Sequence, residues 1–253
     1  MNEEHVLLGA YWRERRITAR QFIELCFNFL VSLRDFSSAF DHHCVAIGQL
    51  PDVVPVSVPK DYASFEQLMM KAVPHPERAY TNPDPANRHF TLESTHVSGF
   101  SVAFSDAGQE GIRPTELGVY VAAGGHGKFG PPDSVLIEIP PDYREFWYGQ
   151  RAKELMRIVV SAWQPSFATL TSRELRKALD AERKNNITLG VVTFFSDRAA
   201  GDVAKECASV ETLPNGGVLI SVEDVPSPWA ESVDRFRPCY SRLNNAGLLK
   251  LVA

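Results

Sequence analysis

Apolar side chains recur every three or four residues in two long stretches of the chain, which is the spacing of a helix buried along one face. The first stretch predicts a helix over Thr18–Asp35, and the second predicts a helix over Tyr143–Trp163 that ends before Pro165. Both starts resemble capping boxes, in which an oxygen-bearing side chain and a Gln or Glu three residues later satisfy free N–H groups of the first turn. The same pattern marks two further helix starts, at Ser64–Gln67 and Thr171–Glu174.

Shorter runs of β-branched and aromatic residues, bounded by Gly, Pro or Asp, predict strands. They are Phe100–Phe104, Val119–Ala122, Val135–Ile139 and Leu189–Phe195. A hairpin is expected over Val210–Val222, because Asn215-Gly216 between two apolar runs supplies the positive φ angles of a tight turn. Helices and strands are grouped rather than strictly alternating. The pattern therefore predicts an α+β fold with a mixed or antiparallel sheet packed with several helices. A long helix followed by strands occurs twice, which suggests two similar halves.

The 253 residues of the chain suffice for one large domain or two small ones. We expect a single domain over residues 1–253, with any subdivision falling near residue 140. The N-terminal sequence Met1–His5 has no cationic segment and no cleavage-site pattern, and no apolar run approaches the roughly 18 residues of a membrane span. The sequence therefore predicts a soluble, cytoplasmic protein with no membrane partner. In a reducing cytosol its four cysteines are expected to be free thiols.

Charge disfavours direct binding of nucleic acid. The chain has 26 basic and 31 acidic residues, a formal net charge of −5, whereas a sequence-independent binder of DNA or RNA normally has an excess of cations. Residues 45–140 hold 11 acidic residues against 6 basic ones, so this stretch carries most of the negative charge.

Two acidic clusters on predicted loops are the candidates for a binding surface, since loops can vary without disturbing the core. The first cluster is Asp106, Glu110 and Glu116, and the second is Glu223, Asp224, Glu231 and Asp234. Trp229 lies within the second cluster. The sequence leaves open whether its side chain anchors a partner or caps the core.

A search for catalytic and cofactor motifs gives a negative result. The chain has no nucleophile elbow, phosphate-binding loop, dinucleotide fingerprint, zinc-protease motif or EF-hand loop. Gly124–Lys128 is interpreted as a flexible loop between strands. The adjacent residues His42, His43 and Cys44 are not matched by a second ligand pair at a metal-binding spacing. We therefore predict no catalytic residues, no metal and no cofactor. A hydrolase-like enzyme with a site in the loops around Gly124–Pro132 is the alternative.

Several segments in a fixed order carry a family resemblance. Leu8-Gly9-Ala10-Tyr11-Trp12 leads into the first helix with its Phe29-Leu30 pair. The second half has Trp163-Gln164-Pro165 at a helix end, then Gly216-Gly217-Val218-Leu219-Ile220 and Asp224. In this order and at this chain length, the sequence resembles the bacterial polymorphic-toxin immunity protein 52 family over most of its length.

This resemblance implies a function in binding rather than catalysis. Members of the family are antidotes kept in the cytoplasm of the toxin-producing bacterium, and they have no reaction of their own. Their toxins are typically nucleases with a restriction-endonuclease-like fold, often delivered by type VI secretion. The partner that the resemblance implies is thus a cognate nuclease toxin. The antidote would inhibit it either by plugging its metal-dependent cleft or by blocking its assembly or the approach of its substrate.

Overall fold

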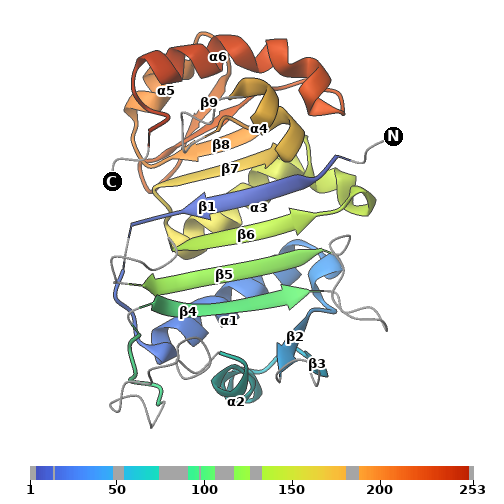
Figure 1. Ribbon diagram of the computed structural model, residues 1–253, viewed down its shortest axis with the longest axis vertical. Helices are drawn as coiled ribbons and strands as arrows, with labels where there is room; N and C mark the ends of the chain where they lie inside the picture. Colours follow the sequence, from blue (N-terminus) through green and yellow to red (C-terminus); the bar gives the residue numbers. More distant parts are fainter. Residues whose placement is uncertain are drawn as a thin grey trace. The chain divides into compact units, whose positions relative to one another are not determined.

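The computed structural model describes residues 4–13, 15–47, 54–73, 91–96, 98–105, 117–125, 133–180 and 188–250 (Figure 1). The fold is α+β with antiparallel strand pairing, as the sequence predicted. By its internal contacts the chain divides into two compact units. The terminal unit comprises Met1–Tyr11 with Ile137–Ala253, and the middle unit comprises Trp12–Leu136. That the whole chain acts as one domain stays a prediction.

The terminal unit contains an antiparallel sheet with the strand order β1-β7-β8-β10-β9. Its strands are β1 (Val6–Tyr11), β7 (Phe167–Ser172), β8 (Val192–Phe195), β10 (Val218–Ser221) and β9 (Ser209–Thr212). β6 (Ser134–Ile139), within which the boundary between the units falls, neighbours β1. The hairpin expected near the C-terminus is confirmed, because β9 and β10 pair antiparallel on either side of the predicted turn.

Helices cover both faces of this sheet. They are α3 (Gly149–Trp163), α4 (Arg173–Leu179), α5 (Ala199–Ala204) and α6 (Val233–Asn245), with the 3-10 segments η4 (Pro141–Phe146) and η5 (Trp229–Ser232). Arg157 of α3 binds Glu211 of β9, whereas Gly201 of α5 lies against the side chain of Val210, the preceding residue of the same strand. Because successive side chains of a strand point to opposite faces, α3 and α5 lie on opposite sides of the sheet. This arrangement explains why β7, β8 and β10 are buried along their whole length.

The middle unit contains a second antiparallel arrangement with the strand order β3-β2-β4-β5. Its strands are β2 (Cys44–Ile47), β3 (Val54–Ser57), β4 (Ser98–Ser105) and β5 (Gly118–Gly125). α1 (Ala19–Phe36) contacts β5, and α2 (Tyr62–Ala72) contacts both α1 and β2, with the 3-10 turn η1 (Ser38–Phe40) following α1. The apolar face of α1 that the spacing predicted is buried at Phe22, Cys26, Phe29 and Leu33.

The first predicted helix start is confirmed in detail, and the other three are corrected. Thr18 and Gln21 form the reciprocal hydrogen bonds of a capping box at the start of α1. α2 is capped by the side chain of Asp61, three residues before the predicted Ser64, because a carboxylate there accepts the same kind of orphan N–H. α4 is capped by Ser172 rather than Thr171, one residue later than expected.

The long helix predicted over Tyr143–Trp163 is two elements. A 3-10 segment, η4, ends before Trp147, and the α-helix begins only at Gly149. Tyr143 has non-helical backbone angles inside η4, so the predicted cap at Asp142 does not start an α-helix. The strand predicted over Leu189–Phe195 begins later, at Val192. Among the described residues, no helix combines the length and the hydropathy needed to cross a bilayer.

Candidate partner-binding surface

The second acidic cluster spans the connection between β10 and α6 and the first turn of α6, and we call residues 223–234 the acidic loop. Of the acids predicted on loops, Glu231 lies in the 3-10 segment η5 and Asp234 lies in α6. Glu223, Asp224, Glu231 and Asp234 are all exposed to solvent in the structure. Asp224 has a φ of 55°, a left-handed conformation that Asp and Asn adopt more readily than most residues. The predicted site residues of this cluster are therefore brought together on one exposed segment, apart from Trp229.

The buried carboxylate of Glu4 holds the acidic loop in place through hydrogen bonds. Glu4, which is only 7% exposed, accepts a hydrogen bond from the hydroxyl of Ser227 at 2.7 Å and another from the backbone N–H of Trp229 at 2.8 Å. It also accepts a bond from the hydroxyl of Ser172, the cap of α4, at 2.9 Å. A carboxylate removed from water is costly unless donors surround it, and here three donors do so. Glu4 thus connects the start of the chain to the acidic loop and to α4.

The side chain of Trp229 is packed in the core and also holds the acidic loop in place. Its side chain is 0% exposed, and its ring lies edge-on to those of Trp147 at 6.0 Å and Tyr148 at 5.8 Å between centroids. In this structure the ring has no surface to offer a partner. Of the two interpretations that the sequence left open, the burial of Trp229 supports core packing.

Basic side chains accompany the exposed carboxylates of the acidic loop. Lys153 of α3 binds Glu223 with a separation of 3.1 Å between Nζ and Oε1, and Arg237 binds Asp234 at 3.1 Å. Arg235 is exposed on the first turn of α6. The side chains of Asp224 and Glu231 make no ion pair within the part of the chain that the structure describes. The surface is consequently mixed in charge, with Asp224 and Glu231 as its uncompensated carboxylates.

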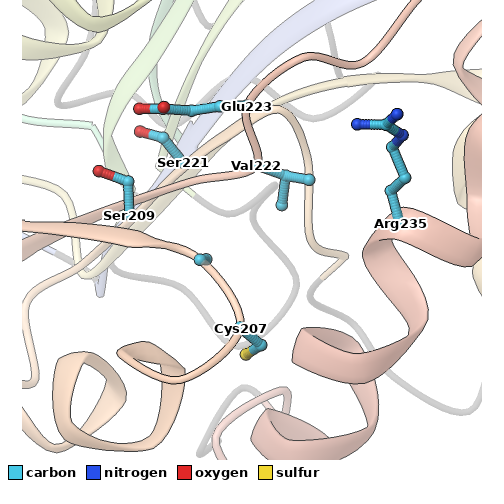
Figure 2. Close-up of a pocket in the computed structure, with 7 residues that line it drawn as sticks. Cys207, Ser209, Ser221, Val222, Glu223 and Arg235 are labelled. Carbon is cyan, nitrogen blue, oxygen red and sulfur yellow. The ribbon is translucent and has the colours of Figure 1, made fainter.

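A pocket of about 320 Å³ opens at the end of the β9–β10 hairpin, beside the acidic loop (Figure 2). Ser209 and Ser221 are directly opposite each other in the two strands, so their side chains point to the same face, and Glu223 follows in the same alternation. Val222 points to the other face, toward Cys207 and toward Arg235 of α6 (Figure 2). No local sequence pattern indicated this pocket, because its lining comes from three separate segments that only the fold brings together.

The other predicted site lies outside the described residues. Asp106, Glu110 and Glu116 belong to residues 106–116, and the loop of the alternative enzyme hypothesis lies mostly within 126–132. Gly124 and Gly125, which the sequence assigned to a flexible loop, are instead the buried end of β5. The extended β5–β4 pairing at Gly125 explains this correction.

Asp133, the first described residue after that loop, is a buried carboxylate that the sequence did not single out. Its Oδ2 accepts a hydrogen bond from the indole of Trp12 at 3.0 Å, and its Oδ1 accepts one from the backbone of Gly125 at 3.2 Å. Burial raises the pKa of Asp133, while these donors and the backbone N–H of Arg15 act in the opposite direction. The contacts describe a structural carboxylate that fastens the segment after β1 to the end of β5.

His42, His43 and Cys44 do not converge on a common point. His42 is exposed, whereas His43 is 1% exposed and packs edge-on against Phe40. Burial, assisted by the charge of Arg34, lowers the pKa of His43 from its usual 6.5 to about 4. The backbone of Leu117 acts weakly in the other direction, but neither ring nitrogen has a partner in hydrogen-bonding geometry. Within the described ranges, no three His, Cys, Asp or Glu side chains are grouped so that they could hold a metal ion.

The fold defines a class of protein with antiparallel strands and helices in two compact units. No protein-family model matches the chain, and no curated protein does. Among solved structures, the chain is similar to the Pseudomonas aeruginosa type VI secretion system (T6SS) protein PA0821, with a TM-score of 0.53 and 13% identical residues. The match covers 98% of this chain and 76% of that one. At this identity the likeness shows a common fold.

Proposed function

We propose that this protein is an immunity protein that binds and neutralises a cognate nuclease toxin of a type VI secretion system. The observation that carries the proposal is the fold likeness to a T6SS protein over 98% of the chain. The ordered segments noted in the sequence led to the same hypothesis, although no protein-family model matches the chain. In this proposal the protein acts in the cytoplasm by binding alone, with the toxin as its partner and with no cofactor.

The acidic loop is the surface that we assign to the toxin. A nuclease must attract phosphate, so the surface around its active site is basic and complements exposed carboxylates. Glu4 and Trp229 hold the acidic loop in one conformation before any partner arrives. Such preorganisation lowers the entropic cost of binding. Asp224 and Glu231, which have no cation of their own among the described residues, are available for a basic partner.

Co-expression tests the proposal directly. We expect this protein to restore growth of cells that produce a nuclease encoded beside its gene, because a bound toxin cannot reach nucleic acid. His42→Ala and Cys44→Ala should protect as well as the wild type, since neither side chain is part of a clustered site. The measurement is the number of surviving colonies with and without the protein. Failure to protect against any toxin encoded beside the gene would refute the proposal, and loss of protection in a folded His42→Ala variant would favour an enzyme.

A charge-removal variant tests the assigned surface. The double change Asp224→Asn with Glu231→Lys should lower the rate of association with the toxin about tenfold at low salt, because it removes the carboxylates that steer encounter. Asparagine at position 224 keeps a residue that tolerates the positive φ. The difference should shrink at physiological salt, where charges are screened over about 8 Å.

Stopped-flow association at two salt concentrations measures this effect. The matched control is Asp142→Asn with Asp202→Lys, two exposed acids of the same unit that lie outside the acidic loop. The control makes the same change in net charge, so it separates a local effect from a general one. Equal rates for the two double variants would show that the toxin binds elsewhere on the protein.

A further inference from the structure

Two of the four cysteines lie on neighbouring segments of the terminal unit. Cys207 follows α5 and lines the pocket at the end of the hairpin, where its thiol is half-buried and donates a hydrogen bond to the carbonyl of Ala204 at 3.2 Å. Cys239 is 0% exposed on the inner face of α6. All four cysteines of the chain are free thiols in the structure, as expected.

The side chains of Cys207 and Cys239 are neighbours, because hydrogen bonding to Cys207 contributes to the raised pKa of the Cys239 thiol. The segments that carry them are held together, because α5 packs against α6 and Glu206 binds Arg242 with 2.7 Å between Oε2 and Nη1. Each residue of this ion pair is close in sequence to one of the cysteines. The ion pair therefore holds together the two segments that carry these cysteines.

We propose that Cys207 and Cys239 form a redox pair that closes to a disulfide when a peroxide reaches Cys207 through the pocket. In the first step the sulfur of Cys207 attacks hydrogen peroxide, the O–O bond breaks, and Cys207 becomes a sulfenic acid with release of one water. In the second step the sulfur of Cys239 attacks that sulfenic sulfur, the S–O bond breaks, and a second water leaves. The peroxide is reduced, and the two thiols are oxidised with loss of both thiol hydrogens.

The surroundings assign different tasks to the two residues. Cys207 lines a pocket that a small oxidant can enter, whereas Cys239 is enclosed by α6 and its neighbours. Burial raises the pKa of Cys239 above its usual range, and the adjacent thiol of Cys207 adds to the effect. A buried, protonated thiol is a poor first target for peroxide. Cys207 is thus the residue that is oxidised first, and Cys239 is the residue that resolves the sulfenic acid.

Closure of the disulfide would fasten α6 to the connection between α5 and β9. Since α6 starts at the end of the acidic loop, the oxidised protein should hold the C-terminal side of that loop more firmly. A cross-link between residues 207 and 239 also restricts the unfolded chain, which raises stability. Oxidation should therefore increase the melting temperature, by about 5 °C or more for a chain of this size.

The test uses the full chain treated with hydrogen peroxide and then with an alkylating reagent under denaturing conditions. Before alkylation, the oxidised protein should have a mass lower by about 2 Da. It should also give a cross-linked pair of peptides containing Cys207 and Cys239, and a higher melting temperature that dithiothreitol reverses. Cys207→Ser should abolish all three changes. Cys44→Ser, which removes the other half-buried thiol, should leave them intact.

The wild-type peptide map keeps the proposal falsifiable even if a variant folds poorly. Cys207 that proceeds to sulfinic acid without linking to Cys239 would overturn the proposal. Full alkylation of both residues after peroxide treatment would overturn it as well. A disulfide between either residue and a different cysteine would have the same consequence.

Discussion

Replacement of Trp229 with alanine should lower the free energy of unfolding by about 3–5 kcal/mol, the usual cost of deleting a large aromatic side chain from a core. The ring of Trp229 is fully buried against Trp147 and Tyr148, so the neighbours cannot fill the cavity without moving. The midpoint and slope of urea unfolding, followed by circular dichroism, measure this loss. We expect the midpoint to fall while the slope stays unchanged.

Trp229→Phe is the matched control for this change. The indole N–H of Trp229 is buried without a hydrogen-bond partner in the described structure, so phenylalanine removes an unsatisfied donor while it keeps an aromatic ring. Its cost should stay below about 1.5 kcal/mol. A Trp229→Ala variant that keeps the wild-type midpoint but dissociates faster from the toxin would contradict core packing. Such a result would restore Trp229 as a partner anchor.

The parts of the fold that the sequence predicted well are those governed by local patterns. The apolar spacing and the Thr18–Gln21 box located α1 to within one residue at each end. The Asn215-Gly216 turn located the β9–β10 hairpin. In both cases residues close in the sequence decide the structure, through helix periodicity and through turn geometry.

Elements whose stability comes from distant partners escaped prediction. β1 has no strong alternation, and its place in the sheet depends on pairing with β7, more than 150 residues away in the chain. α6 contains Pro238, which argues against a helix on local grounds, yet its inner face at Phe236, Cys239 and Leu243 is buried in the terminal unit. Burial of that face compensates for the backbone hydrogen bond that a proline cannot donate.

The sequence predicted which acidic residues form the candidate surface, but not the contacts that hold them in place. Charge and turn residues indicated an exposed acidic segment at Glu223 and Asp224. No local pattern connects Glu4 to that segment, because the hydrogen bonds from Ser227 and Trp229 join residues more than 220 positions apart. The compensating cation Lys153 likewise lies on a different element. Such contacts are properties of the fold. They hold the acidic loop in place and leave Asp224 and Glu231 as its two uncompensated carboxylates.

Acidification should destabilise the protein through His43. The pKa of this residue is about 4 in the folded state, against 6.5 for an exposed histidine. Between these values the unfolded chain binds a proton that the folded protein excludes, so stability is fully present above pH 6.5 and falls as the pH drops toward 4. The difference in pKa corresponds to about 3 kcal/mol of unfolding free energy. Urea unfolding at pH 7.5 and pH 4.5 measures most of this loss.

His43→Leu isolates the contribution of His43 from that of other acids and bases, including Arg34 beside it and the carboxylates of Asp41 and Asp133. Leucine cannot take up a proton and has no buried nitrogen to satisfy, so the variant should lie within about 1.5 kcal/mol of the wild type at pH 7.5. Its loss of stability on acidification should be smaller than that of the wild type by about 3 kcal/mol. His42→Asn, at an exposed neighbouring position, should keep the wild-type pH dependence. An equal loss of unfolding free energy by His43→Leu and the wild type between the two pH values would contradict the prediction. It would mean that His43 takes up its proton in the folded protein and that the segment around Phe40 opens at acid pH.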